Sequence, residues 1–381
     1  MAGRDTEIAA APADGEQPLP AGTVIDGRYR LIAQIAAGGM GRVYEAEHMF
    51  LRRRIALKLL RGGQGSAEAA ARMVQEATLA GQVPHPAIVR VFDCADLGAG
   101  RVYVAMELLR GETLELALQR PGRAAQILPW LADVARGLAA AHRVGVVHRD
   151  VKPANILLAC DGPAGEGVQA KLLDFGVAKL LPGAAGSGGV QTEAGAVLGT
   201  PYYLAPEQAR GAALDGRADL YGLGVILYEV LTGELPFVGE SFMAILAQHL
   251  NTPPLDPRQA APGRAIPDGV ALLAMRLLAK DPQARPPSGD AVAEAIAALL
   301  TTEGAALERL VTGRRGDELA EGTGAGTVRV AVDGLAEGTG VGTVRVVVDG
   351  LAEGTGVGNG ARAVGVGARA RRARLAVAVL G

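Results

Sequence analysis

A short polar insert interrupts an apolar run between residues 146 and 158. The run is VVHRDVKPANILL, and its polar members are His148, Arg149, Asp150, Lys152 and Asn155. Charged groups are costly to bury without partners, because each one loses its hydration and gains nothing in return. The insert must therefore face a ligand, a metal ion or a cleft.

Lysine is rare in this chain, where arginine outnumbers it by 33 to 5. Because arginine serves wherever a general cation suffices, a lysine in an unusual place is informative. Lys58, in the apolar segment RRIALKLL, and Lys152 are two such cases. The other three lysines, at positions 171, 179 and 280, call for no special role.

A glycine turn lies between two strand-like segments in RYRLIAQIAAGGMGRVYEAEHMF. Gly38, Gly39 and Gly41 lack side chains, so backbone N–H groups there could approach phosphate oxygens. A plain tight hairpin explains the glycines equally well. A Rossmann fold expects a helix after them, whereas RVYEA favours a strand, and the P-loop pattern GxxxxGK[ST] does not occur in the chain.

The elements around these residues fall into two parts. β-branched and aromatic segments dominate residues 28 to 108, with one helical stretch in SAEAAARMVQEATLAGQV. From LPWLADVARGLAAAHRVG onward, apolar residues recur at helical spacing. The pattern predicts an α+β protein with a strand-rich lobe followed by a helix-rich lobe.

Composition excludes several classes of function. A formal net charge of −2 and a pI near 6.3 give no general attraction to nucleic acid. Two cysteines make neither a disulfide framework nor a CxxC metal site, which favours a reducing, cytoplasmic compartment. Residues 1 to 27 are expected to form a disordered polar leader, because they lack the apolar core of a secretory signal. The segment LYGLGVILYEVLTG is too short to span a bilayer.

The region after residue 300 has a different composition. A 16-residue unit begins at Leu319, Leu335 and Leu351, within a glycine-rich region that spans residues 301 to 361. Two and a half copies are too few to stack into a stable solenoid. The region is either a flexible linker or a small ordered β element. Residues 362 to 381 carry five arginines before a short apolar end, and form either the start of a membrane anchor or a loose tail.

Five motifs occur in a fixed order along the chain: the glycine turn, Lys58 in IALK, Glu76 in the helical stretch, HRDVKPAN, and LLDFG ending at Gly176. In this order they resemble the eukaryotic-type serine/threonine protein kinases, especially the bacterial branch, over residues 28 to 300. The resemblance implies the two-lobed protein-kinase fold. Its small β-rich N-lobe would span about residues 28–108, and its larger α-helical C-lobe about 109–300.

The resemblance also implies catalytic roles. Lys58 would bind the phosphates of ATP, and Glu76 would hold its ammonium group in place. Asp150 would orient the hydroxyl of the substrate, and Lys152 would neutralise the transferring phosphoryl group.

ATP and Mg²⁺, or Mn²⁺, are the implied cofactors. Asn155 and Asp174 would supply oxygen ligands to the metal. The first glycine of the family's GxGxxG pattern is Ala36 here, which would stiffen the loop modestly. The residues expected around the nucleotide are Ile35, Ala36, Ala37, Gly38, Gly39, Met40, Gly41, Arg42, Val43, Ala56, Lys58, Met106, Glu107, Leu109 and Leu157.

GTPYYLAPEQ resembles the end of a kinase activation segment. Thr200 would line the peptide groove, Glu207 would pair with Arg285, and Asp219 would brace the catalytic loop from a buried helix. Together with DVKPAN, this segment favours serine or threonine over tyrosine as the acceptor. It also disfavours a small-molecule kinase, because it shapes a peptide groove.

Regulation is expected at Arg149, an extra cation beside Asp150. A phosphate on the glycine- and alanine-rich segment from residue 176 to 206 would pair with it. Ser187, Thr192 and Thr200 are the hydroxyls considered, and Thr192 is the one expected to be phosphorylated.

The sequence therefore predicts an ATP-dependent serine/threonine protein kinase in cytoplasmic signal transduction. A nucleotide-binding pseudokinase scaffold is the alternative, but Lys58, Asp150, Asn155 and Asp174 are all retained. Protein substrates and ATP are the expected partners, with no nucleic acid. The resemblance also allows a homodimer for trans-autophosphorylation, and the arginine-rich tail allows contact with the cytoplasmic face of the membrane.

Overall fold

A computed structural model shows how the chain positions these residues. It describes residues 18–38, 41–60, 83–98, 101–120, 124–160, 167–174 and 201–312, with scattered positions between 71 and 81. Some of the sequence predictions concern residues outside these ranges. They are the leader up to residue 17, the repeats, the arginine-rich tail, Gly39, Met40, Glu76, Thr192 and Thr200.

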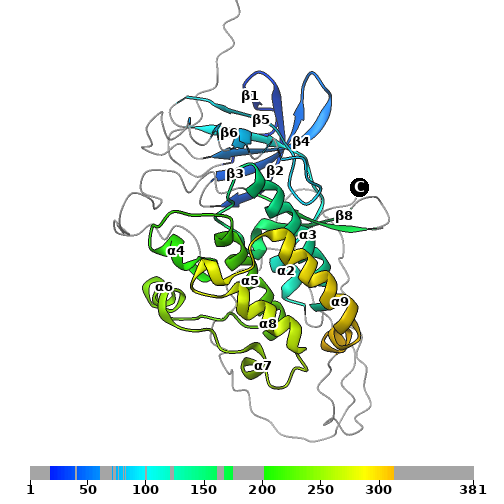
Figure 1. The fold of residues 1–381 in the computed structure, drawn as a ribbon. Helices are drawn as coiled ribbons and strands as arrows, with labels where there is room; N and C mark the ends of the chain where they lie inside the picture. Colours follow the sequence, from blue (N-terminus) through cyan, green and yellow to red (C-terminus); the bar gives the residue numbers. More distant parts are fainter. Residues whose placement is uncertain are drawn as a thin grey trace, which may run out of the picture. The chain divides into compact units, whose positions relative to one another are not determined.

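The N-lobe is built on one antiparallel sheet (Figure 1). Its strand order is β1-β2-β3-β4-β6-β5, so the glycine turn joins the neighbouring strands β2 and β3. The strands are β1 (Val24–Ile25), β2 (Tyr29–Gly38), β3 (Gly41–His48), β4 (Arg53–Leu60), β5 (Val91–Asp96) and β6 (Val102–Met106).

Alternation along the strands sorts their side chains onto two faces of this sheet, because successive residues of a strand point to opposite sides. Tyr44, Leu57 and Tyr103 belong to the buried cluster on the outer face. Ala56 and Met106 belong to a second cluster on the inner face. Lys58 shares the inner face, because its position in β4 alternates in step with Ala56.

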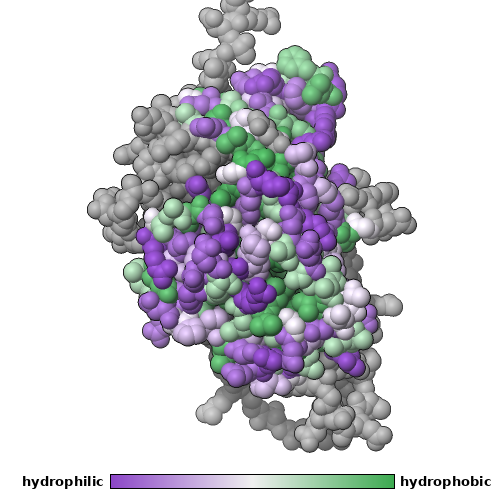
Figure 2. Space-filling view, in the orientation of Figure 1, coloured by the Kyte–Doolittle hydropathy of each residue, from purple (hydrophilic) through white to green (hydrophobic). Residues whose placement is uncertain are grey.

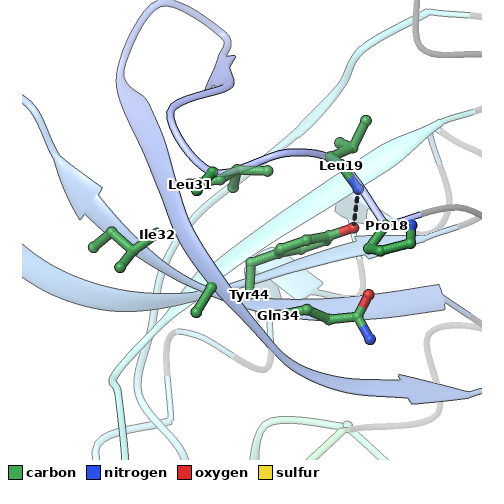
Figure 3. A pocket seen from close by; sticks show the side chains of 8 residues that line it. Pro18, Leu19, Leu31, Ile32, Gln34 and Tyr44 are labelled. Atoms are coloured by element: carbon green, nitrogen blue, oxygen red, sulfur yellow. Dashed lines mark hydrogen bonds between the residues drawn. The ribbon is translucent and has the colours of Figure 1, made fainter. Parts of the chain in front are cut away.

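The predicted disordered leader is wrong for residues 18–27, which contain β1 and bond to the N-lobe sheet. The segment before β1 covers the outer face. The Leu19 N–H donates to the Tyr44 hydroxyl over 3.0 Å, and the Leu19 side chain packs on the outer cluster. A cavity of about 260 Å³ lies beneath the segment (Figure 3). Its lining includes Leu31, Gln34 and Tyr44, so the cavity lies away from the inner face that carries Lys58.

Gly41 closes the glycine turn against the neighbouring strand β4. A Cβ atom at this position would lie 2.2 Å from the Leu59 carbonyl oxygen, and the residue has a φ of 157°. Only glycine permits this approach of the two backbones. The pairing of Gly38 with Gly41 confirms the predicted hairpin geometry.

The C-lobe is helical and packs around α5 (Figure 1). Helix α5 is buried along nearly its whole length, which explains its almost continuous apolar sequence. In the described part of the chain, no helix has the length and apolar character needed to cross a membrane. The helices are α2 (Leu114–Leu118), α3 (Ala124–Arg143), α4 (Pro206–Ala209), α5 (Arg217–Thr232), α6 (Phe242–Asn251), α7 (Pro257–Ala260), α8 (Asp268–Leu277) and α9 (Gly289–Thr312).

A small three-stranded sheet begins directly after the hinge, the segment that follows β6 and joins the two lobes. Its order is β7-β8-β9, with β7 at Gly111–Thr113, β8 at Ile156–Cys160 and β9 at Val168–Leu172. Asn155 directly precedes β8, and Asp174 follows β9 after one residue. Because β8 and β9 are antiparallel, the start of one lies beside the end of the other, and the Leu173 N–H donates to the Asn155 carbonyl over 2.8 Å.

Helix α9 continues past residue 300, where we expected the kinase domain to end. Leu307 is fully buried in the main core of the C-lobe. The Glu303 carboxylate accepts the N–H of Gly269 over 2.9 Å and thereby caps the start of α8. The helix ends at Thr312, so the expected boundary falls inside an element that packs on the C-lobe.

The surface of the described part mixes hydrophilic and hydrophobic residues without one continuous apolar face in the view shown (Figure 2). Hydrophobic residues gather at the tip between β3 and β4, where Phe50 and Leu51 are 75% and 71% exposed.

Candidate active site

The catalytic loop, which contains His148, Arg149 and Asp150, is held in place by one buried carboxylate. Asp219, in the first turn of α5, accepts the backbone N–H groups of His148 over 2.8 Å and Arg149 over 2.7 Å. It also lies 2.7 Å from Nε2 of His142 on α3. Because Asp219 is 1% exposed, these bonds replace the hydration that its charge has lost. The predicted bracing role of Asp219 is confirmed.

His148 connects this loop to the segment that carries Asp174. Its Nε2 lies 2.7 Å from the Leu173 carbonyl, and its Nδ1 accepts the Asp150 N–H over 3.2 Å. Complete burial lowers the pKa of His148, although Asp219 opposes the shift. Because Nδ1 accepts a hydrogen bond and Nε2 faces a carbonyl oxygen, this pair of bonds requires the ring proton on Nε2, and the ring joins both segments.

Asp150 is oriented by two neighbours on its own loop. Asn155 Nδ2 donates to Asp150 Oδ2 over 2.9 Å and to its carbonyl over 2.8 Å, and Lys152 Nζ lies 2.9 Å from the same Oδ2. The short helix η1 (Pro153–Asn155) creates this spacing, because it turns the chain between Lys152 and Asn155. The structure thus brings together three of the predicted residues.

Lys58, on β4 of the N-lobe, pairs with Asp174, which follows β9. Its Nζ lies 2.8 Å from Asp174 Oδ2, and the two side chains are 14% and 38% exposed. Val43 and Val104 flank Lys58 on the adjacent strands, so its stem is packed while its ammonium group meets the Asp174 carboxylate. Its expected partner Glu76 lies outside the described residues.

The donor set fits a hard divalent cation. The Asp174 carboxylate and the Asn155 amide oxygen lie on adjacent segments, and Asn155 uses its nitrogen for Asp150. Among the described residues, no group of three His, Cys, Asp or Glu side chains could hold a metal unaided. Two protein oxygen ligands suit Mg²⁺, because proteins usually bind this ion through one or two side chains and leave its other positions to phosphate oxygens and water.

The catalytic loop and the segment after β9 each contain a strained residue. Arg149 has a φ of 64° and Asp174 a φ of 49°. Such positive φ values cost a non-glycine residue roughly 1–3 kcal/mol. At Arg149 the surrounding bonds compensate, because Asp219 holds its N–H and Gln208 Nε2 donates to its carbonyl over 2.9 Å.

An apolar slot lies on the inner face, where the nucleotide is expected. Ala56 and Met106 are paired across β4 and β6, and Val43 and Leu109 pack on the same cluster. Ile35 is 50% exposed above it, and Leu157 lies on β8 of the small sheet. The Glu107 N–H donates to the Arg90 carbonyl. The backbone group that Glu107 could offer to a nucleotide is therefore its own carbonyl oxygen.

The remaining residues expected at the glycine turn lie on its two strands. Ala36 pairs with Val43, and Ala37 pairs with Arg42. Arg42 Nη1 also donates to Gln34 over 2.9 Å, on the same two strands.

The segment that follows Thr200 is anchored by a buried ion pair. Arg285 donates to both carboxylate oxygens of Glu207, over 2.6 and 2.8 Å, and its Nε donates to the Ala279 carbonyl. The predicted pair is confirmed. Sequence reasoning missed Gln208, whose side chain accepts from Ala205 and donates to Arg149, and so joins this segment to the catalytic loop.

A second polar cluster supports the same segment. The Tyr221 hydroxyl lies 2.9 Å from His249 Nδ1, and Lys280 Nζ donates to the His249 carbonyl over 2.8 Å. Burial, and secondarily the charge of Lys280, lowers the pKa of His249 to about 4. Burial also lowers the pKa of Lys280 to about 8. Sequence analysis assigned Lys280 no role.

His249 should make the stability of the domain sensitive to acid. Its pKa is depressed in the folded state, so its contribution is complete above the unfolded value of 6.5 and disappears as the pH falls through about 4. The loss should approach about 3 kcal/mol. Urea unfolding at several pH values between 7 and 4 measures it. His249→Gln, which keeps an acceptor but cannot titrate, should flatten this slope; an unchanged slope would contradict the account.

Comparisons with known proteins agree with this geometry. A family model described as the protein kinase domain matches residues 29–296. The serine/threonine-protein kinase pkn2 of Myxococcus xanthus is 44% identical over 285 residues, covering 73% of this chain and 33% of that protein. The serine/threonine-protein kinase PknA of Mycobacterium tuberculosis is 39% identical over 287 residues, covering 73% of this chain and 62% of that protein.

Among solved structures, the PknI kinase domain of Mycobacterium tuberculosis superposes with a TM-score of 0.58 at 26% identity. That alignment covers 74% of this chain and 99% of the solved domain. The chain spans only part of its curated relatives, from 33% of pkn2 to 62% of PknA.

Proposed function

The chain belongs to the protein kinase family, in the bacterial serine/threonine branch, and we propose that it transfers the γ-phosphoryl group of ATP to serine and threonine hydroxyls of proteins. The observation that carries this proposal is the set of contacts among the predicted site residues. Asp150, Lys152 and Asn155 contact one another, Lys58 from the N-lobe contacts Asp174, and the Leu173 N–H joins the two groups by donating to the Asn155 carbonyl.

Asp150 is the group suited to the substrate hydroxyl. Its Oδ2 is held by Asn155 and Lys152, so the carboxylate is oriented before any substrate arrives. It would align the hydroxyl and accept its proton as the new P–O bond forms. Lys152 contacts the same Oδ2 atom, and its ammonium group would stabilise the negative charge of the transferring phosphoryl group.

Lys58 and Asp174 are suited to the nucleotide. The compact ammonium group of Lys58 makes a point contact with phosphate oxygens, and it already lies at the carboxylate expected to hold the metal. When bound, ATP would supply the phosphoryl group, and Mg²⁺ would neutralise part of the negative charge of its phosphates. Asp174 and Asn155 would hold that metal through oxygen atoms.

A protein acceptor is favoured over a small molecule. The anchor formed by Glu207, Arg285 and Gln208 fixes the end of the segment that would shape a peptide groove, with Thr200 expected in that groove. The pseudokinase alternative is disfavoured because Lys58, Asp150, Asn155 and Asp174 are all retained, with Lys58 paired to Asp174 and Asn155 bonded to Asp150.

Exchange of Asp150 for asparagine should separate chemistry from nucleotide binding. Asp150→Asn removes the proton acceptor but leaves Lys58 and Asp174 in place, so turnover should fall about 10² to 10⁴-fold. ATP affinity should change less than about twofold. Peptide phosphorylation and nucleotide titration measure the two quantities.

Asp133→Asn is the control, because it removes an exposed carboxylate on α3 that pairs with its neighbour Arg136. It should leave both quantities as in the wild type. Wild-type turnover in folded Asp150→Asn would refute the proposed role of Asp150.

Thr192 is proposed as the activating phosphorylation site. A phosphate there would bring about −1.5 to −2 charges to Arg149, whose backbone is already fixed by Asp219 and Gln208. Thr192→Ala and Arg149→Ala should therefore lower activity by similar factors that do not add in the double variant. Mass spectrometry should find phosphate at Thr192 in the active protein, with Ser187→Ala as a neutral control. Full activity without that phosphate would contradict the mechanism.

We further propose that the chain acts in the cytoplasm, where two copies phosphorylate each other. Contact with the cytoplasmic face of a membrane rests on the arginine-rich tail of residues 362–381. Cell fractionation with and without that tail distinguishes membrane contact from a loose tail.

A further inference from the structure

Lys171, which the sequence left without a role, forms a shielded ion pair beside the nucleotide slot. Its Nζ lies 2.8 Å from Oε1 of Glu107, and the two side chains are 12% and 21% exposed. In a chain with 33 arginines and 5 lysines, a lysine in this place is unusual. A partly buried ion pair also costs desolvation, so its position needs a physical reason.

Glu107 is the first residue after β6, on the hinge between the lobes. Its carboxylate accepts the Arg90 N–H over 2.9 Å through the same Oε1, and its own N–H donates to the Arg90 carbonyl over 2.9 Å. Two bonds therefore attach Glu107 to the N-lobe. The bond from Lys171 attaches the Glu107 side chain to strand β9 of the small sheet.

Lys171 lies on β9 at a position that connects both ends of the nucleotide site. It is paired across the strands with Leu157, so the two side chains share one face of the small sheet, and Leu157 is the residue expected beneath adenine. Asp174, the expected metal ligand, follows three residues later. Strand β9 is itself held firmly, because Leu172 bonds to Ala87 and Val89 through its backbone.

We propose that the Glu107–Lys171 ion pair sets the separation between the adenine-binding hinge and the metal-binding Asp174. Backbone bonds also join these parts, through Leu172 and Val89 and where the hinge chain continues into β7, and the ion pair adds a side-chain link at Glu107 itself. A nucleotide contacts both sites at once, so its affinity depends on their being held at a matching distance. Lys171 is thus a positioning residue for ATP. The inference rests on the proposed function, because it assumes that ATP spans these two sites.

The pair should affect ATP and adenosine differently. Adenosine reaches the hinge but has no phosphates to meet the metal site, and the bonds between Glu107 and Arg90 persist when Lys171 is replaced. Lys171→Met should therefore weaken binding of Mg·ATP about tenfold, or about 1.4 kcal/mol. Adenosine affinity should change less than about twofold, and kcat at saturating ATP should also stay within about twofold.

Titration of the full chain with Mg·ATP and with adenosine measures these affinities, with thermal melting to confirm folding. Lys171→Arg should restore most of the ATP affinity, because it returns a cation to Glu107. Glu107→Gln should reproduce the effect of Lys171→Met, and the double variant should be no weaker than either single one. Arg143→Met is the matched control, since it removes a 2.7 Å ion pair with Asp290 between α3 and α9.

Unchanged ATP affinity in folded Lys171→Met would overturn the inference. An equal loss for ATP and adenosine, without rescue by Lys171→Arg, would also overturn it, because the pair would then support only the hinge. The proposed function fails separately: a wild-type chain that binds Mg·ATP but transfers no phosphate would count against the kinase activity and not against the ion pair.

Discussion

The buried carboxylate of Asp219 is the constraint on which the active site depends. A charge that is 1% exposed must be satisfied by donors, and Asp219 takes them from the backbone of His148 and Arg149 and from the ring of His142. Helix α5, which carries Asp219, is buried along nearly its whole length. The catalytic loop is therefore attached to the most buried helix of the domain.

The other parts of the site follow from that attachment. Arg149 can hold a positive φ because both its N–H and its carbonyl are bonded, the latter to Gln208 next to the Glu207–Arg285 anchor. His148 also bonds to the Leu173 carbonyl, and Leu173 directly precedes Asp174, so the catalytic loop holds the backbone next to Asp174. From Asp174 the contacts reach Lys58 in the N-lobe, while Lys171 on the same strand reaches the hinge. A few polar contacts thus link both lobes around one cleft.

The sequence predicted the residues that act through local motifs and missed those that act through distant partners. Lys58, Asp150, Asn155 and Asp174 were identifiable because their neighbours in sequence define them, and the roles of Asp219, Glu207 and Arg285 followed from the family. Gln208 and Lys171 were missed because their partners lie far along the chain, at Arg149 and Glu107. The boundary at residue 300 fell inside α9 because nothing in an alanine-rich stretch shows that Leu307 reaches a core built by other helices.

Amide hydrogen exchange at His148 and Arg149 tests the central claim most directly. If Asp219 holds both N–H groups, they should exchange slowly in the wild-type chain. In Asp219→Asn, which has one acceptor oxygen fewer and no charge, exchange at these two amides should rise at least about tenfold, while the core of α5 stays protected. Wild-type protection of both amides in the folded variant would contradict the account, because the loop would then be held by other contacts.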